Sequence, residues 1–283
     1  MNAGDGGCSS VISLLALVSL FHPVMLMARE AARPDAATII SRSVEVVKKD
    51  WQSAPRYNHY ERDRLDDGTK TYDITMILGS PYSKLLAING VPLSGEAKQK
   101  EQQKLDSAIA QRCSESKAER DKRIEAYQKS VQRNHHLTEG LTAAFVFKLL
   151  GERTVGARAV WLLDASPKPG YRPPDEETKV LTGMRGKLWV DKTSYEWVRV
   201  QAWVVNPVSI EGFLARVEPG TVFELARAPV PGGSWQPQHF SVKAQARILG
   251  FIDHRTHDDE SYFNYRQNSP AAVSCPASVS GRE

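Results

Sequence analysis

The residues best suited to metal chemistry lie in one short run near the end of the chain, Asp253 to Glu260. The run contains His254 and His257, three positions apart, with carboxylates on both sides. Imidazole and carboxylate groups are ligands for zinc and other divalent ions. The run falls between two predicted strands, where a polar turn is expected, and no helix fixes the histidine spacing. We therefore expect a solvated turn, and a metal-dependent enzyme using His254 and His257 is the alternative.

The other polar clusters match no catalytic motif. His135 and His136 precede Glu139 but do not form an H-E-x-x-H motif. The chain has no G-x-S-x-G elbow, no P-loop and no G-x-G-x-x-G, and no spacing singles out a catalytic triad. The sequence therefore predicts a protein that is not an enzyme, with no cofactor and no resident metal.

Length and composition fit one large globular domain. The chain has 283 residues, of which 41% are hydrophobic and 25% charged, and its formal net charge is +4. These values exclude general disorder and a protein with several membrane spans. The weak, diffuse positive charge is compatible with contact to an anionic membrane surface but does not indicate a nucleic-acid-binding groove.

The first 28 residues are predicted to be a signal peptide. An apolar run from Val11 to Ala28 ends in a small residue and is followed by charge, although no Lys or Arg precedes it. An uncleaved anchor or a mis-assigned start are the alternatives. Cys8 precedes the run, so we expect it to be removed with the signal peptide. The mature domain is then predicted over 29–267, with a loose tail over 268–283, in the periplasm or secreted.

Two cysteines remain in the predicted mature chain, Cys113 and Cys275. An oxidising envelope compartment permits a disulfide between them. The alternative is two unrelated thiols, one on a helix and one in the tail, because the sequence does not give the separation of their Cα atoms.

Two amphipathic helical segments are predicted. Asp35 can cap a helix in which Ile40, Val44, Val47 and Trp51 recur at helical spacing. A charged insertion over 95–133 carries only a thin apolar stripe, which includes Ile124, Tyr127 and Val131. We interpret the insertion as one long solvated helix, or two, packed along one narrow edge, and a mobile lid or partner-binding helix is the alternative.

The rest of the chain alternates with period two, as antiparallel strands do. The predicted strands are 57–65, 69–79, 83–88, 143–154, 157–165, 186–191, 194–205, 208–215, 221–226, 239–252 and 260–266. No strand–helix–strand alternation occurs, so a parallel doubly wound sheet is excluded. We predict an α+β fold: a curved antiparallel sheet of about nine to eleven strands, an unclosed barrel, with helices covering its concave face.

The strand–turn–strand segment GKLWVDKTSYEWVRVQ, from Gly186 to Gln201, resembles the signature of the LolA/LolB-like superfamily of bacterial lipoprotein-localisation carriers and lipoprotein-sorting proteins. The entry into the next long strand, with Trp235 and Pro237, is similar to theirs, as are Tyr262 and Tyr265 near the end of the closing strand. The resemblance implies an unclosed barrel in the cell envelope that binds acyl chains without catalysis. It also implies a lipid or lipoprotein acyl chain as ligand and, as further contacts, a membrane surface or an envelope protein.

Large apolar side chains in the predicted strands are candidates to line such a cavity. These candidates are Trp161, Trp189, Trp197, Trp203, Met76 and Phe240. Apolar ligands are bound by surfaces of this kind, but large aromatic side chains also fill cores. The alternative to a carrier is therefore a structural or partner-binding envelope protein whose interior is filled by its own side chains.

Overall fold

The computed structural model describes residues 34–65, 67–176, 178–210, 215–248, 252–268 and residue 275. The predicted signal peptide and Cys8 lie outside the described residues. From Pro34 onward the chain forms one compact unit. None of the helices in the described part is long and apolar enough to cross a membrane.

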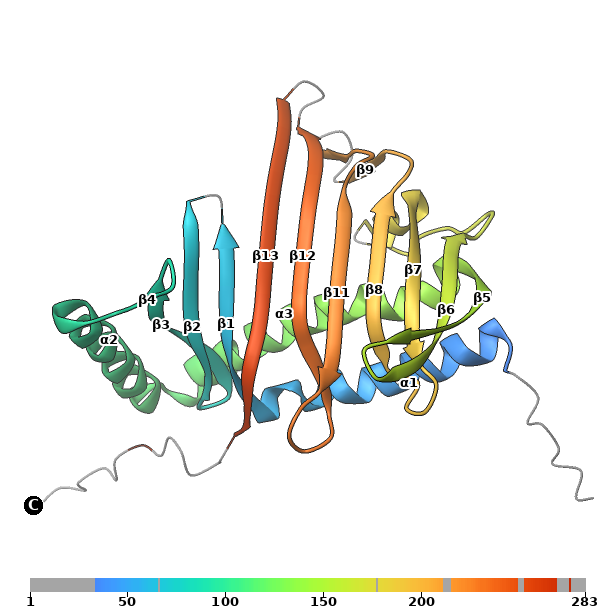
Figure 1. Cartoon of the computed structure of the whole chain (residues 1–283). Helices are drawn as coiled ribbons and strands as arrows, with labels where there is room; N and C mark the ends of the chain where they lie inside the picture. The colour runs from blue at the N-terminus through green and yellow to red at the C-terminus, as the bar shows by residue number, and fades with distance from the viewer. Residues whose placement is uncertain are drawn as a thin grey trace, which may run out of the picture. The chain divides into compact units, whose positions relative to one another are not determined.

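One antiparallel sheet contains all the described strands (Figure 1). The strands are β1 Tyr57–Leu65, β2 Gly68–Ile77, β3 Ser80–Ile88, β4 Val91–Pro92, β5 Phe145–Val155, β6 Arg158–Pro167, β7 Met184–Asp191, β8 Trp197–Val204, β9 Val208–Ile210, β10 Ala215–Val217, β11 Val222–Pro229, β12 Trp235–Ile248 and β13 Ile252–Gln267. Their order is β4-β3-β2-β1-β13-β12-β11-β8-β7-β6-β5, with β9 and β10 attached through β12. The chain therefore runs from β1 outward to the edge at β4, crosses to the opposite edge at β5, and returns inward to β13 beside β1. The edge strands β4 and β5 do not pair with each other, so the sheet stays open. The predicted α+β class with an unclosed antiparallel sheet is confirmed.

Helix α1, Ala36–Ser53, begins where the sequence predicts. The carboxylate of Asp35 accepts a hydrogen bond from the backbone N–H of Thr38 at 2.7 Å, which satisfies one free donor of the first turn. The apolar side of α1 then packs on β6, β7 and β8. A short 3₁₀ turn, η1 Ala54–Arg56, leads from α1 into β1.

The main core lies between α1 and the sheet. It joins Ile39, Ile40 and Val47 of α1 to strand residues that are almost completely buried: Trp161, Leu163, Leu188, Val190 and Trp197. A second cluster forms where helix α3 meets the 3₁₀ turn η2, Thr178–Gly183. We call the face of the sheet that carries α1 and α3 the helical face.

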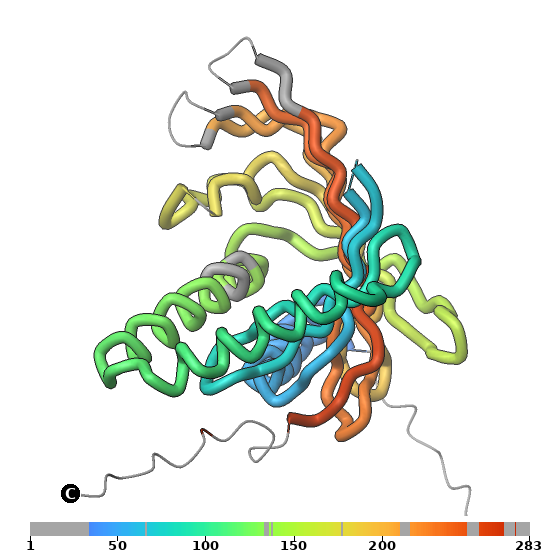
Figure 2. The backbone as a smooth tube through the Cα atoms, turned by 90° about the vertical axis from the view of Figure 1, so that its left-hand side faces the viewer, coloured from blue at the N-terminus to red at the C-terminus, as the bar shows by residue number. Residues whose placement is uncertain are grey.

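The charged insertion forms two helices, α2 Gly95–Ser114 and α3 Lys117–Ala144. Ser116 and Glu119 form a reciprocal capping box that starts α3. Helix α3 continues about eleven residues beyond the predicted end near 133, up to Ala144 directly before β5. Helix α2 contains no buried residue, in agreement with the predicted solvated helix. In Figure 2 both helices lie on the same side of the sheet as α1.

Two arginines from the insertion hold the β2–β3 turn, which comprises Leu78 and Gly79 at positive φ. Arg112 donates to three carbonyl oxygens around this turn at 2.8–3.1 Å, those of Ile77, Ser80 and Pro81. A guanidinium group is suited to this role, because its donors project in a fixed planar arrangement.

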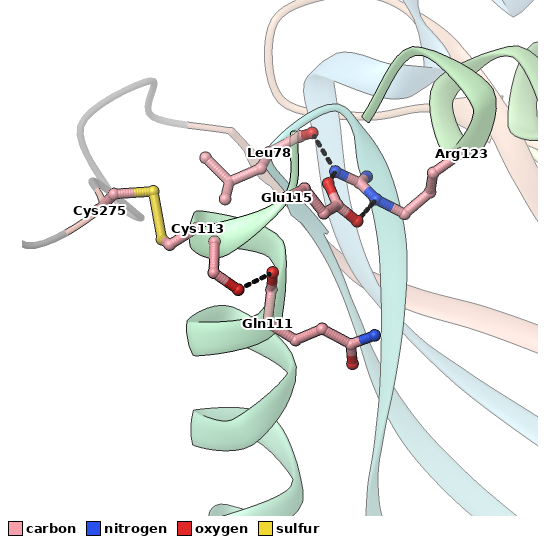
Figure 3. The surroundings of a disulfide bond; sticks show 7 residues. Leu78, Gln111, Cys113, Glu115, Arg123 and Cys275 are labelled. Atoms are coloured by element: carbon pink, nitrogen blue, oxygen red, sulfur yellow. Dashed lines mark hydrogen bonds and ion pairs between the residues drawn. A yellow bond between two sulfur atoms is a disulfide. The ribbon is translucent and has the colours of Figure 1, made fainter. Parts of the chain in front are cut away.

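The second arginine, Arg123 of α3, donates to the carbonyl of Leu78 at 3.3 Å and to the carboxylate of Glu115 at 2.7 and 2.6 Å (Figure 3). The pKa of Glu115 is lowered, mainly by this hydrogen bond. The corner between α2 and α3 is therefore fixed to the sheet by polar contacts, not by an apolar core.

Candidate functional site

An apolar strip crosses the helical face of the central strands. It comprises two rows of side chains from β8, β11 and β12: Val200, Leu225 and Phe240, and Ala202, Phe223 and Val242. Paired residues share a face of the sheet, and Val200 is also paired with Leu188 of the core. The strip therefore continues the core surface toward the middle of the sheet. Unlike the core residues, all six side chains of the strip remain partly exposed.

Helix α3 crosses the central strands on this face, as Figure 1 shows. It approaches the sheet closely at its two ends, at β3 and at β5 with η2. Ile124 packs against Gly79 in the β2–β3 turn, and Tyr127 and Val131 follow on the same side of the helix. These three side chains are also only partly buried. Apolar surface thus remains accessible both on α3 and on the strip that it crosses.

One end of the strip meets acidic side chains. Phe240 is paired with Glu260 of β13, and Glu260 is paired with Asp63 of β1. Burial raises the pKa of Asp63 to about 7, with the negative charges of Glu61 and Glu260 adding to the effect. The buried Oδ1 atom of Asp63 has no hydrogen-bond partner among the described residues. The row therefore changes from apolar to ionisable within two strands.

Glu260 is itself perturbed. Its pKa is raised by burial, although the hydroxyl of Tyr262 donates a hydrogen bond to it. His59 stacks on Tyr265 at 5.1 Å between ring centroids and contacts the edge of Tyr262 at 5.8 Å. The acidic end is therefore bordered by aromatic rings from β1 and β13.

Replacing Asp63 with asparagine is expected to stabilise the protein above pH 7. A carboxyl group whose folded-state pKa is raised stabilises the fold below its unfolded pKa near 4, and this contribution is lost as the pH rises to about 7. Asparagine does not ionise, so the variant avoids this loss. Its free energy of unfolding above pH 7 should exceed that of the parent protein by about 1 kcal/mol, after allowance for partial exposure. Urea unfolding at pH 5 and pH 8 measures the stability difference between the variant and the parent protein, which should be clearly larger at pH 8 than at pH 5. An equal change at both pH values would contradict the raised pKa.

Two of the predicted cavity residues belong to the core. Trp161 and Trp197 are 4% and 3% exposed under α1. The indole Nε1 of Trp197 donates to Ser43 Oγ at 3.1 Å. A bulge between β7 and β8 leaves Val198 unpaired, so Trp197 lies on the helical face beside Val190. Under α1 the interior is thus filled by the protein's own side chains, as the non-carrier alternative expects.

The other four candidates are divided between the two faces. Trp189 and Trp203 alternate with helical-face residues and lie on the opposite face, where the guanidinium of Arg199 stacks on Trp189 at 5.5 Å. Phe240 is part of the strip, and Met76 lies on the helical face of β2 toward the edge. Of the six candidates, only Phe240 therefore contributes to the apolar strip.

The predicted polar turn over 253–260 is wrong. These residues are part of β13, which pairs with β12 from Ile252 onward, with His257 opposite Lys243 and His254 opposite Ala246. Positions separated by an odd number of residues lie on opposite faces of a strand, so a spacing of three does not place two metal ligands together. Among the described side chains, no group of three or more His, Cys, Asp or Glu could hold a metal ion.

The second histidine cluster has a structural partner. His136 Nε2 lies 2.5 Å from the Oδ2 atom of Asp175, and this contact connects α3 to the loop between β6 and η2. Asp175 also accepts from the backbone N–H of Thr178 at 2.8 Å, and this hydrogen bond and that of His136 lower its pKa to about 2. Glu139 pairs with Lys48 of α1 at 2.7 Å. These contacts fix the carboxy-terminal half of α3.

A disulfide joins Cys113 of α2 to Cys275, with the two Cα atoms 5.5 Å apart (Figure 3). It links the region beyond the last strand to the insertion, across a sequence separation of 162 residues. Cys113 lies one residue after Arg112, which holds the β2–β3 turn. The covalent link and the arginine contacts thus act on the same end of α2.

Sequence reasoning did not select most of the strip or its acidic end. The alternation that places Phe240 and Val242 on one face is visible in the sequence, but the partners Leu225 and Phe223 follow only from the register of β11 with β12. The acidic end joins strands separated by almost 200 residues, and no local pattern in the sequence indicates that pairing.

Comparisons with known proteins find similarity in structure but not in sequence. No protein-family model and no curated protein matches the chain. A LolA superfamily protein from Nitrosomonas europaea covers 84% of this chain and 95% of its own, at 8% identity and a TM-score of 0.30. A domain from Vibrio parahaemolyticus, described as an outer-membrane lipoprotein-sorting protein, covers 82% and 94%, at 8% identity and a TM-score of 0.33. A DUF1329 family protein from Desulfovibrio piger covers 83% and 95%, at 11% identity and a TM-score of 0.32.

Two of these structures carry the LolA superfamily or lipoprotein-sorting description, which is the group that the segment from Gly186 to Gln201 resembles in sequence. A likeness at these TM-scores says nothing about a ligand. The function proposed below rests on the side chains of this chain.

Proposed function

We propose that this protein is a non-enzymatic binding protein of the bacterial cell envelope that holds an acyl chain of a lipoprotein or another apolar lipid on the helical face of its sheet. The observation that carries the proposal is the apolar strip crossed by α3. Its six side chains are contiguous with the core but remain partly exposed. Exposed contiguous apolar surface of this kind is typical of a binding site.

The binding energy would come from burial of the ligand's methylene groups. Each buried CH₂ contributes about 0.8 kcal/mol, so about ten of them supply about 8 kcal/mol before the costs of association. A micromolar dissociation constant requires about 8 kcal/mol after those costs are subtracted, so binding in this range needs more than ten buried methylene groups. The ligand's polar end would lie near Asp63 and Glu260, where a neutral or hydrogen-bond-donating group meets less repulsion than a carboxylate.

The envelope location is supported by two independent features. The apolar run from Val11 to Ala28 has the pattern of a signal peptide. The disulfide between Cys113 and Cys275 suits an oxidising compartment such as the periplasm. Release and uptake would require the middle of α3, between its contacts with β3 and those with α1, η2 and β5, to move away from the strip.

An environment-sensitive fluorescent fatty acid tests this function below pH 7, where Asp63 is mostly protonated and repels the carboxylate of the probe less. The probe is expected to brighten on binding, with a dissociation constant in the micromolar range. Leu225→Asn removes apolar surface from the strip and should weaken binding about tenfold or more.

The matched control is Val222→Asn. Val222 lies on the same strand and is also partly buried, but its pairing with Trp203 places it on the opposite face. This variant should bind the probe as the unmodified protein does. No brightening, or equal weakening in both variants, would contradict the proposed function.

A further inference from the structure

A buried arginine connects three elements beneath the end of α1. Arg227 of β11 has a side chain that is only 1% exposed. Its Nη1 donates to Glu196 Oε2 at 2.9 Å, and its Nη2 lies 3.4 Å from Asp50 Oδ2. Nη2 also donates to the carbonyl oxygen of Trp235 at 2.7 Å. One guanidinium therefore contacts two carboxyl groups, that of Asp50 in α1 and that of Glu196 in the turn between β7 and β8.

Asp50 is the contact through which α1 joins this group. Its carboxylate accepts from the backbone N–H of Trp235 at 2.7 Å and from Ser234 Oγ at 3.1 Å. Ser53 Oγ lies 2.7 Å from Ser234 Oγ. The carboxy-terminal end of α1 is therefore held to the β11–β12 hairpin by polar contacts.

The part of α1 from Ile39 to Val47 is held differently. Ile39, Ile40 and Val47 are buried in the apolar core, whereas Trp51 of the last turn packs at its margin and is only partly buried. Apolar contacts of this kind do not depend on protonation, whereas the contacts of Asp50 depend on the charge around it. The two parts of the helix can thus respond differently to a change in pH.

The charges at this site do not balance if both carboxyl groups are ionised. Two carboxylates against one guanidinium leave a net negative charge in a buried place, which is costly. Burial raises the pKa of Glu196 to about 8, and a hydrogen bond to Asp50 adds to the effect. Among the described groups, Asp50 and Arg227 act on Glu196, and Tyr265 of β13 acts on Arg227. At neutral pH Glu196 therefore carries a proton and the group is neutral overall.

We propose that Asp50, Glu196 and Arg227 form a proton-controlled latch, which holds the carboxy-terminal end of α1 on the sheet and loosens it when Glu196 loses its proton. Deprotonation places two carboxylates side by side against one guanidinium, and moving Asp50 away relieves this repulsion. Because the folded-state pKa of Glu196 is raised, the holding energy is complete below about pH 4.5 and decreases as the pH rises to about 8. The latch needs no ligand, so it can be tested independently of the proposed function.

Hydrogen exchange of α1 followed by mass spectrometry tests the latch. Exchange is measured on the full chain at pH 5.5 and pH 8.5, each corrected for the intrinsic exchange rate. Protection of residues 48–53 is expected to fall about tenfold or more at the higher pH, with residues 39–46 unchanged. Glu196→Gln keeps the hydrogen-bonding shape without an ionisable group, and should keep residues 48–53 protected at both pH values.

Glu224→Gln is the matched control, because Glu224 is a carboxylate on β11 that pairs with Arg199 away from the latch. It should retain the full pH effect. If Glu196→Gln does not fold, Asp50→Asn replaces it, since this change removes the second carboxylate and should also reduce the pH effect. The proposal is overturned if protection is lost along the whole of α1, or if the pH effect persists in Glu196→Gln.

Discussion

Removal of the disulfide is expected to lower the free energy of unfolding by about 4–5 kcal/mol. The bond joins residues 162 positions apart, so its loss frees a very long loop in the unfolded chain. It also releases the region around Cys275 from α2, at the end of the helix where Arg112 contacts the β2–β3 turn. Urea unfolding of Cys113→Ser beside the oxidised parent protein measures the difference.

The two single variants serve as each other's control. Cys113→Ser, Cys275→Ser and the double variant should all show the same loss, because each removes the same bond. A reducing agent should destabilise the parent protein to the level of these variants and leave the variants unchanged. Unfolding curves of the parent protein that do not respond to reduction would contradict a stabilising role for this bond.

Replacement of Trp197 by alanine is expected to destabilise the protein by about 3–5 kcal/mol. Its side chain is 3% exposed in the core under α1 and donates to Ser43 Oγ. Truncation leaves a large cavity and removes the donor for a buried hydroxyl. Thermal or urea unfolding measures the loss, which should be much smaller for Trp189→Ala on the opposite face.

The same variant separates a core role from a ligand-binding role. If Trp197 belongs to the core, the folded fraction of Trp197→Ala should bind the fatty-acid probe nearly as well as the parent protein. Abolished binding with little loss of stability would instead place the ligand under α1, and the strip would not be the main site.

Local signals in the sequence were sufficient for most of the elements. Asp35 and the spacing of Ile40, Val44 and Val47 predict α1, and Asp67-Gly68 predicts the first hairpin. The period-two pattern predicts an antiparallel sheet with one apolar face. Such a face must be buried, so the amphipathic helices are expected to cover it. These features depend on neighbours along the chain, which a sequence displays directly.

The errors arise where distant pairing determines the outcome. The polar run from Asp253 to Glu260 resembles a turn, but its backbone completes a strand against β12. Regular alternation would place Trp197 and Val200, three positions apart, on opposite faces of the sheet. The bulge at Val198 brings both to the helical face. Helix α3 extends to Ala144 because its last turns pack on η2 and β5, which no local pattern indicates.

The acidic end of the strip and the latch have the same origin. Asp63 and Glu260 come together only through the pairing of β1 with β13. Asp50, Glu196 and Arg227 come from a helix, a turn and a strand that are far apart in sequence. The raised pKa values of Asp63, Glu260 and Glu196 follow from burial and from neighbouring charges, which depend on the folded arrangement.

Photolabelling with a diazirine-bearing fatty acid, followed by peptide mass spectrometry, would show directly whether lipid binds at the apolar strip. Labels are expected on the β11 and β12 segments 222–226 and 240–244 and on the 124–131 segment of α3. Excess unlabelled fatty acid should suppress them, and Leu225→Asn should reduce them. Absence of labelling, or labels confined to residues around Trp189 and Trp203 on the opposite face, would contradict lipid binding at the strip.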